Sequence, residues 1–213
     1  GGGPLVTAFD TKVRTGEPAF QFIAYDSTFR GGVRVAAADI NGDTLADIIT
    51  AAGKGGGPHV KVFDGATGDT IRSFFAYGPG FTGGVFVAGG DVDNDSVPDI
   101  VTAAGAGGGP HVKVFSGATG QEIRSFFAYT ASFTGGVHVA ASDVNGDGFA
   151  DIITGAGAGG GPHVRVFNGK TGQLLNEFFA YPASFLGGVK VTAGDINNDG
   201  QVEVITGPGL GGG

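Results

Sequence analysis

A segment of 52 residues recurs along this chain of 213 residues. Each copy carries a short loop of alternating acidic residues, and the loops begin at Asp39, Asp91, Asp143 and Asp195. Periods of about 20 to 50 residues are typical of solenoids, propellers and similar arrays, in which each unit buries apolar surface against its neighbours. Glycine fills 45 positions without a period of three, which excludes a collagen-like chain and suits many tight turns.

Each copy predicts four short β-strands, named here A to D in chain order. In residues 83–134 the runs "GGVFVAGG", "DIVTAAG", "HVKVF" and "IRSFFAY" are separated by glycine, aspartate or proline. No window shows a sustained helical period with caps, so we expect essentially no helix. Four antiparallel strands in about 50 residues make a propeller blade, which predicts an all-β propeller of four-stranded blades.

The chain reads as one domain over residues 1–213, with repeats at 31–82, 83–134, 135–186 and 187–213, the last completed by 1–30. It opens with strands C and D of one unit and closes with strands A and B of another. These halves can form one hybrid blade, which would close a ring of four blades without a free edge. Two alternatives stay open: part of a seven- or eight-bladed ring, and two chains that exchange their end halves. We expect either a monomer or such an end-swapped homodimer.

The acidic loops have the pattern of a site for a hard cation. Counted from the first aspartate, positions 1, 3, 5 and 9 carry side-chain oxygens in every copy, and position 7 would contribute its backbone carbonyl. Calcium takes six to eight such oxygens. The predicted ligands of about four calcium ions are Asp39, Asn41, Asp43, Leu45, Asp47, Asp91, Asp93, Asp95, Val97, Asp99, Asp143, Asn145, Asp147, Phe149, Asp151, Asp195, Asn197, Asp199, Gln201 and Glu203.

Two other readings of these loops are weaker. An EF-hand needs a glutamate at position 12 between helices, whereas position 12 is threonine here, inside a strand. A solvated Asp/Asn turn is common between strands, but four copies keep every liganding position while their neighbours vary. Position 4 is glycine or asparagine, the residues that most easily adopt a left-handed conformation: Gly42, Asn94, Gly146 and Asn198.

Charge also favours a bound cation. Thirteen of the 20 acidic residues lie in the four loops, and four calcium ions would balance the net charge of −8. Two carboxylates about 4 Å apart repel by roughly 4 kcal/mol at an effective dielectric constant of about 20. Extracellular calcium modules bind with dissociation constants of about 10⁻⁴–10⁻³ M, which cytosolic calcium would not fill, so we expect an extracellular protein, secreted or on the cell surface.

The strand "GGVxVAAxD" followed by "DxNxDGxxDI" resembles the FG-GAP repeat, the calcium-loop blade of integrin α-chain propellers and of many bacterial surface proteins. The resemblance covers nearly the whole chain. It implies a β-propeller with calcium in the A–B loops on one face and ligands usually on the other. Rings of the family usually have seven blades, whereas four repeats are present here.

Three sets of repeated positions are further candidates. His59, His111 and His163 begin strand C and could line a ligand or metal site, although an imidazole bonded to a carbonyl of a neighbouring blade's glycine loop is the more ordinary role. The "FFAY" runs and Phe29, Phe81, Phe133 and Phe185 predict core between blades. Inside "GVxV" of strand A the copies differ sharply, which makes these positions candidates for ligand binding, with random drift as the alternative: Arg34, Phe86, His138 and Lys190.

Several function classes are disfavoured. The acidic balance argues against nucleic acid, and no stretch is long and apolar enough to enter a bilayer. "GAGAGGGP" matches a dinucleotide fingerprint, but a strand follows it where a helix is needed. No catalytic motif lies outside the acidic loops. We therefore expect a non-enzymatic recognition or adhesion module for a glycan or protein, with a scaffold domain as the alternative and a propeller polysaccharide lyase as the third reading.

Overall fold

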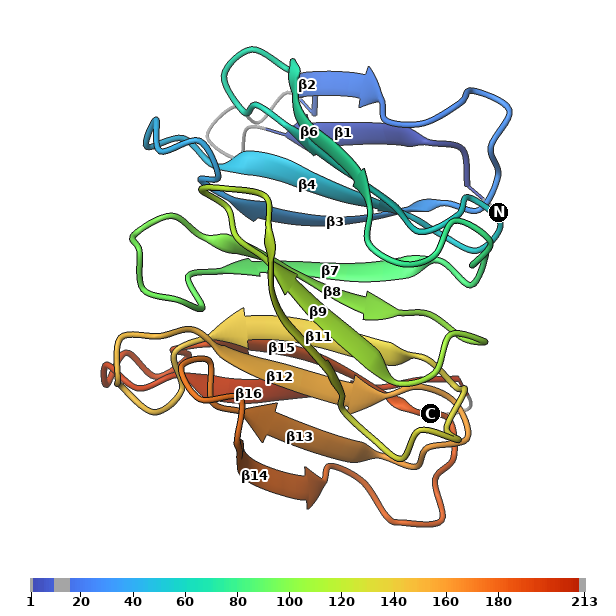
Figure 1. Ribbon diagram of the computed structural model, residues 1–213, viewed down its shortest axis with the longest axis vertical. Coiled ribbons are helices and arrows are strands. Elements are labelled where there is room, and N and C mark those ends of the chain that lie inside the picture. The colour runs from blue at the N-terminus through green and yellow to red at the C-terminus, as the bar shows by residue number, and fades with distance from the viewer. Residues whose placement is uncertain (1, 10–15, 211–213) are drawn as a thin grey trace.

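The computed structural model describes residues 2–9 and 16–210, which form β-strands and no helix (Figure 1). The strands are β1 (Leu5–Phe9), β2 (Pro18–Ile23), β3 (Val33–Ala38), β4 (Asp47–Ala52), β5 (His59–Phe63), β6 (Thr70–Phe75), β7 (Val85–Gly90), β8 (Asp99–Ala104), β9 (His111–Phe115), β10 (Glu122–Phe127), β11 (Val137–Ser142), β12 (Asp151–Ala156), β13 (His163–Phe167), β14 (Leu174–Phe179), β15 (Val189–Gly194) and β16 (Glu203–Pro208). The all-β prediction is confirmed.

Three complete blades follow one another along the chain. Each is a four-stranded antiparallel meander in the order A–B–C–D: β3 to β6, β7 to β10 and β11 to β14. The second strand of each blade lies between two partners and between two neighbouring sheets. Its residues are therefore buried on both faces, as in β8, where all six are buried. This explains why strand B reads as a continuous apolar run and not as an alternating one.

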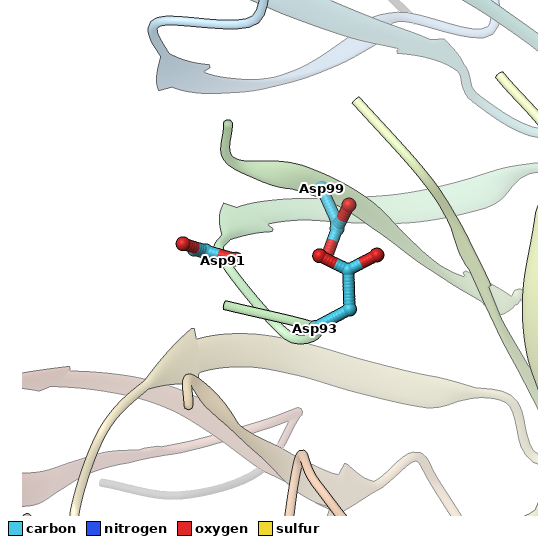
Figure 2. Close-up of side chains that lie close together, drawn as sticks. All are labelled: Asp91, Asp93 and Asp99. Carbon is cyan, nitrogen blue, oxygen red and sulfur yellow. The ribbon is translucent and has the colours of Figure 1, made fainter. Parts of the chain in front are cut away.

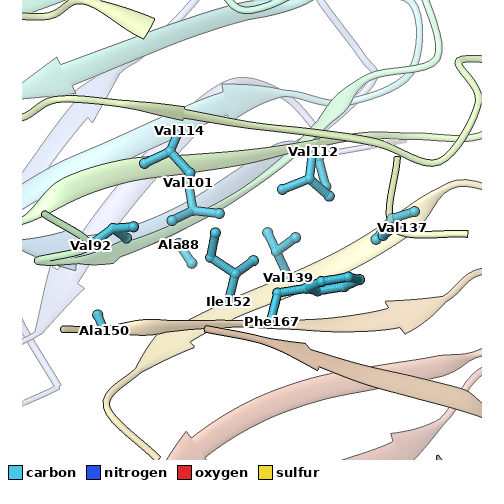
Figure 3. Close-up of a cluster of buried hydrophobic side chains, with 12 residues drawn as sticks. Ala88, Val92, Val101, Val112, Val114, Val137, Val139, Ala150, Ile152 and Phe167 are labelled. Atoms are coloured by element: carbon cyan, nitrogen blue, oxygen red, sulfur yellow. The ribbon is translucent and has the colours of Figure 1, made fainter. Parts of the chain in front are cut away.

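The core lies between successive sheets, where strand A of one blade packs on its neighbours. The inner strands β3, β7, β11 and β15 contact each other in sequence. Figure 3 shows one such interface, in which Val101 and Val112 of one blade face Val139 and Ile152 of the next. All of these side chains are almost completely buried, so each blade needs its neighbour to exclude water.

Aromatic side chains fill the outer part of each interface, as predicted for the first phenylalanine of "FFAY". Phe74 of β6 lies 4.7 Å from Phe115 of the next blade, between ring centroids, and Phe126 lies 4.8 Å from Phe167. The second phenylalanine differs from the prediction, because Phe75 lies on the outer face and is 57% exposed. Three further phenylalanines pack against a glycine two residues later in the chain: Phe29 against Gly31, Phe81 against Gly83 and Phe133 against Gly135.

The hybrid blade predicted from the two chain ends is not formed in this structure. Strands β1 and β2 form a two-stranded sheet that packs against β3–β6, whereas β15 and β16 form another beyond β11–β14. In Figure 1, β1 and β2 lie at the top of the stack, whereas β15 and β16 overlap β11 and β12 in its lower half. In the described residues β1 pairs only with β2 and β16 only with β15, so both strands keep a free edge.

The fold separates two kinds of loop. Every strand A runs from the glycine-rich B–C loops toward the acidic A–B loops, so the acidic loops gather at one edge of the stack and the glycine loops at the other (Figure 1). Midway between them, the four A strands line a shared groove with small residues such as Ala36, Ala88, Ala140 and Thr192. No helix in the described part of the chain is long and apolar enough to cross a membrane.

Candidate functional site

The first aspartate of each acidic loop organises the backbone around it. In the first loop, Asp39 Oδ1 accepts hydrogen bonds from the N–H groups of Gly42 and Asp43 at 2.7 and 3.1 Å. Its Oδ2 accepts one from the N–H of Thr44 at 2.8 Å. Asp143 and Asp195 make the same three bonds in their loops. Position 1 therefore curls the chain so that alternate residues face inward.

Left-handed residues make this curl possible. Position 4 has positive φ in every loop, as predicted, including Asn94 at 61° and Asn198 at 60°. Position 6 is left-handed as well, which the sequence did not indicate. Its residues are Thr44 at 74°, Ser96 at 73°, Gly148 at 87° and Gly200 at 85°. At position 6, two of the four loops thus hold a non-glycine residue in a conformation that L-residues rarely adopt.

The ninth position ties each acidic loop to another part of its blade. Asp47 begins β4 and is fully buried. Its Oδ2 accepts a hydrogen bond from the N–H of Ile40 at 2.8 Å, and its Oδ1 accepts one from the N–H of Gly65 in the β5–β6 turn at 3.0 Å. Asp99 and Asp151 repeat both contacts. This aspartate is therefore a structural clamp as well as a predicted ligand.

In the second loop, carboxylates converge. Ligand oxygens of Asp91, Asp93 and Asp99 all lie within 4.8 Å of one another, and the carboxylates of Asp93 and Asp99 face each other in Figure 2. Burial raises the pKa of Asp99 to about 6. Burial, and then the charge of Asp95, raises the pKa of Asp93. Both shifts show that negative charge is held there at a cost that a cation would remove.

The other three loops carry asparagine at position 3. Its neutral amide donates a hydrogen bond to the carboxylate at position 5, where the second loop places two carboxylates. Asn41 Nδ2 donates to Asp43 Oδ2 at 3.2 Å, and Asn145 Nδ2 donates to Asp147 Oδ2 at the same distance. Asn197 Nδ2 does so to Asp199 Oδ2 at 3.1 Å. Among the described residues, the second loop alone gathers three acidic side chains at cation-binding range.

The C–D turns supply polar residues that the sequence reasoning missed. Asp64 Oδ2 accepts a hydrogen bond from Asn41 Nδ2 at 3.0 Å, and Asn168 Nδ2 donates to Asp147 Oδ2 at 2.9 Å. The Asn168 amide lowers the pKa of Asp147. Together with Ser116 these residues recur every 52 positions before a glycine, and that spacing was the available signal.

The residues present fit a calcium ion. The donor set is oxygen throughout, and the loop backbone is already folded around it. At position 5, Oδ1 accepts the N–H of position 7, as in Asp43 with Leu45 at 2.8 Å, while Oδ2 bonds only to side-chain amides or to nothing. Position 7 thereby points its N–H at a neighbouring carboxylate. A contribution from its carbonyl remains a prediction.

The three strand-C histidines do not form a common site. His59 Nε2 lies 2.8 Å from Ser73 Oγ, and His111 Nε2 lies 2.8 Å from Ser125 Oγ, both on strand D of the same blade. His163 Nε2 lies 3.2 Å from Glu177 Oε2. The expected bond to a glycine-loop carbonyl is therefore wrong. The tyrosine of the preceding unit bonds the histidine carbonyl instead, as Tyr77 does to His111 at 2.9 Å.

The four variable strand-A residues, in contrast, do come together. Arg34, Phe86, His138 and Lys190 line one cavity of about 400 Å³ at the glycine-loop end of the A strands. The guanidinium carbon of Arg34 lies 3.8 Å from the Phe86 ring centroid, and the rings of Phe86 and His138 are 4.2 Å apart. Burial and the nearby Arg34 lower the pKa of His138 to about 4, so this imidazole is neutral at pH 7.

Comparison with known proteins agrees with this architecture. The solved structure of the exotype rhamnogalacturonan lyase YesX resembles the chain with a TM-score of 0.60 and 14% identity, over 82% of this chain and 38% of the lyase. The chain thus spans about 38% of the length of that protein, and the likeness shows the fold alone. No curated protein matches the chain in sequence.

The family is defined by the repeats themselves. A model described as an FG-GAP-like repeat matches residues 91–154 and again residues 143–206. Each match begins at the first aspartate of one acidic loop and ends in strand B of the next repeat, so it spans the features described above. Together the matches cover more than half of the sequence, and the chain belongs to the family of FG-GAP-like repeat proteins.

Proposed function

We propose that this chain is a calcium-stabilised β-propeller module that works outside the cell and recognises a ligand without catalysing a reaction. One observation carries the calcium assignment: Asp91, Asp93 and Asp99 converge within 4.8 Å in a loop whose backbone architecture recurs in every repeat. Crowded carboxylates destabilise a fold unless a cation neutralises them. In this proposal, calcium supplies that neutralisation and holds neighbouring parts of each blade together.

The side chains at positions 1, 3, 5 and 9 of each loop would hold the ion, with the carbonyl of position 7. The residue at position 9 would extend the effect of calcium beyond the acidic loop, because Asp99 also accepts a hydrogen bond from the N–H of Gly117 in the C–D turn at 3.0 Å. Calcium at this carboxylate would therefore stiffen the A–B loop and the C–D turn together. The millimolar calcium of extracellular fluids suits weak sites of this kind, which is the basis for the proposed secreted or cell-surface location.

Calcium titration tests this part of the proposal. Isothermal calorimetry on protein stripped with EGTA should give about four sites, and calcium should raise the melting temperature markedly. Asp93→Asn should weaken calcium binding at one of these sites. Asp69→Asn is the matched control, because the Asp69 carboxylate lies in an exposed turn outside the acidic loops. Superimposable melting curves with calcium and with EGTA would contradict the assignment.

We further propose that the free edges of β1 and β16 are completed by pairing, which would extend or close the propeller. In complete blades, Ile49 of strand B pairs with Val62 of strand C, and both are fully buried. The equivalent Ile205 on β16 is 37% exposed. The same register would pair Ile205 with Ala8 on β1 of a second copy. In a longer array, it would pair Ile205 with the equivalent strand-C residue of a further repeat.

Light scattering at several protein concentrations tests this pairing for the chain alone. A mass of two chains supports an end-swapped or head-to-tail dimer with eight blades. A mass of one chain at every concentration would contradict pairing between copies of this chain.

For recognition, the supporting observation is that four positions that differ between otherwise similar repeats line one cavity. The cavity lies at the opposite end of the A strands from the acidic loops, so a ligand there leaves the calcium sites intact. We propose a glycan or protein ligand. A glycan array, run with calcium and with EGTA, should give hits that depend on the folded protein. An absence of hits in both conditions, together with no protein partner, would favour a scaffold role.

The likeness to a polysaccharide lyase is one of fold at 14% identity and brings none of that enzyme's residues to this chain. The carboxyl groups of Asp93 and Asp99, whose pKa values are raised, belong to the acidic loops, where they hold the loop backbone and would bind the proposed cation. The non-enzymatic proposal therefore rests on the lining of the cavity, which combines cations, the rings of Phe86 and His138, glycine backbone and the apolar side chains of Ala106, Ala158 and Leu210.

A further inference from the structure

The cavity at the glycine-loop end has an unusual charge for this acidic protein. Its lining includes Arg34, Lys54, His138 and Lys190, and no aspartate or glutamate. In the part of the chain that the structure describes, neither Lys54 nor Lys190 forms an ion pair, and both are exposed. The protein carries a net charge of −8, so three uncompensated permanent cations at one place form a local positive focus.

The acidic residues are arranged to strengthen this contrast. Thirteen of the 20 lie in loops at the far end of the A strands, and calcium would neutralise them there. An anionic ligand that approaches the glycine-loop end therefore meets cations first and is not repelled by nearby carboxylates. Charges arranged in this way raise the association rate of an oppositely charged partner.

Arg34 is held ready for such a ligand. Its Nη1 donates to the Val85 carbonyl at 3.0 Å, and the guanidinium plane lies over Phe86. Val85 is the one hydrogen-bond acceptor of Arg34 among the described residues, which leaves further N–H groups of a rigid donor without a partner. A guanidinium with one bond and one stacked face fixed can offer its remaining donors to an oxyanion at little entropic cost.

The form of the cavity favours a sugar over a peptide. Arg34 and His138 both pack against the Phe86 ring, so this ring is already engaged by protein side chains and is not free to receive an apolar anchor residue. Much of the remaining wall is glycine backbone, at Gly83, Gly135, Gly157 and Gly187. A volume of about 400 Å³ holds a unit the size of one or two sugar rings.

The cations come from different repeats. Arg34 and Lys54 belong to the first repeat and Lys190 to the last, so positive charge is spread along the cavity. A ligand that repeats its charge along a chain matches this spread better than a single small anion does. We propose that the cavity binds an acidic glycan through its repeated carboxylate or sulfate groups, with Arg34, Lys54 and Lys190 as the contacts. This inference rests on the proposed recognition function and gives it a ligand class.

Calorimetric titration with a defined glycan tests the inference. The probe is a hexasaccharide of alternating glucuronate and N-acetylglucosamine, and its matched control is the same molecule with every carboxylate reduced to an alcohol. The acidic form should bind to the calcium-loaded protein and the reduced form at least tenfold more weakly. Raising the salt from about 50 to about 300 mM should weaken binding, because the contacts are partly exposed. A sulfated hexasaccharide in parallel shows which anionic group is preferred, and binding of either charged form supports the proposal.

Three variants locate the site. Lys54→Gln and Lys190→Gln should each weaken binding several-fold, and together by tenfold or more. Both side chains are exposed and unpaired, so neither change threatens folding. Lys170→Gln is the matched control, since Lys170 lies over Phe149 at the acidic-loop end, and it should leave affinity unchanged.

The failures are distinguishable. Equal binding of the charged and reduced hexasaccharides, or full affinity in the double variant, would overturn the acidic-glycan inference and leave the recognition proposal intact. Tighter binding of hexaglutamate than of any glycan would overturn the choice of a sugar. No binding of any glycan, here and on the array, would remove the inference together with the glycan form of the proposed function.

Discussion

The buried carboxylate of Asp99 accepts a hydrogen bond from the backbone N–H of Gly117 at 3.0 Å. The two residues are 18 positions apart, one at the start of strand B and the other in the C–D turn. Asp47 with Gly65 and Asp151 with Gly169 repeat the contact at the same distance. The acidic loop is thus fastened to its blade by protein hydrogen bonds, independently of any ion.

This clamp predicts a large effect of Asp99→Asn even without calcium. The second oxygen of Asp99 accepts the N–H of Val92 at 2.8 Å, so both oxygens face donors. An asparagine must turn its NH₂ group toward one of them, leaving a buried donor unsatisfied, which costs about 1–3 kcal/mol. Urea unfolding in EGTA measures the loss. Asp69→Asn should change stability by less than about 0.5 kcal/mol, and equal effects of the two changes would disprove the clamp.

Asp93→Asn should raise the stability of the calcium-free protein and reduce the stabilisation that calcium provides. Three of the four loops carry asparagine at this position, and the second loop alone holds three converging carboxylates. Without calcium, removing the Asp93 charge relieves repulsion and should raise the melting temperature. With calcium, the loss of a charged ligand should shrink the stabilisation that the ion provides. Melting curves of the variant and of the parent protein in EGTA and in millimolar calcium test both signs. A variant that is less stable than the parent in EGTA would contradict the electrostatic argument.

Position 6 of the acidic loops predicts a stabilising glycine. Thr44 has a φ of 74°, in the left-handed region that a β-branched residue adopts at a cost of about 1–2 kcal/mol. Thr44→Gly relieves this strain and loses about 0.4–1 kcal/mol to the entropy of the unfolded chain, so a gain of up to about 1.5 kcal/mol is expected. Gly148→Thr in the third loop is the reciprocal change and should destabilise the protein. Both are measured by chemical unfolding in calcium, and destabilisation by Thr44→Gly would refute the account.

What the sequence could predict follows from how local each feature is. The strands of residues 83–134 and the left-handed position 4 depend on short patterns and on residue type, and both are confirmed. The left-handed Thr44 and Ser96 could not be predicted, because no local residue preference indicates them. The partner of His59 depends on the register between β5 and β6, which places Ser73 within reach. Closure of the ring depends on the rotation between blades, a property of the packed interfaces.

The tyrosine of the "FFAY" run predicts a test of the unpaired end. Tyr77 OH donates to the His111 carbonyl at 2.9 Å and lies 3.3 Å from Thr102 Oγ1. Within residues 2–9 and 16–210, the Tyr181 hydroxyl has only the equivalent threonine contact, to Thr206 Oγ1 at 3.3 Å, since no strand C pairs with β16 there. Tyr77→Phe should therefore cost about 1–2 kcal/mol and Tyr181→Phe distinctly less.

If a second copy completes the last blade, the difference in stability cost between Tyr77→Phe and Tyr181→Phe should depend on protein concentration. The cost of Tyr181→Phe should then rise toward that of Tyr77→Phe as the protein becomes dimeric, because a strand-C carbonyl becomes available. Urea unfolding at low and high protein concentration measures this. Equal costs for the two changes in a strictly monomeric sample would show that the end blade is already complete within one chain.

His138 predicts a specific dependence of stability on pH. Burial, and then the charges of Arg34 and Lys190, lower its pKa in the folded protein to about 4, from about 6.5 in an unfolded chain. The unfolded state therefore binds a proton first as the pH falls. Stability attributable to this residue is fully present above about pH 6.5, is lost progressively between about pH 6.5 and 4, and levels off below that.

The acidic loops titrate in part of the same range, so the wild type alone is not informative. The difference in unfolding free energy between the wild type and His138→Gln isolates the residue, and it should narrow or reverse in favour of the variant as the pH falls. A difference that stays constant from pH 7 to pH 4 would mean that the imidazole already finds a compensating anion in the folded cavity.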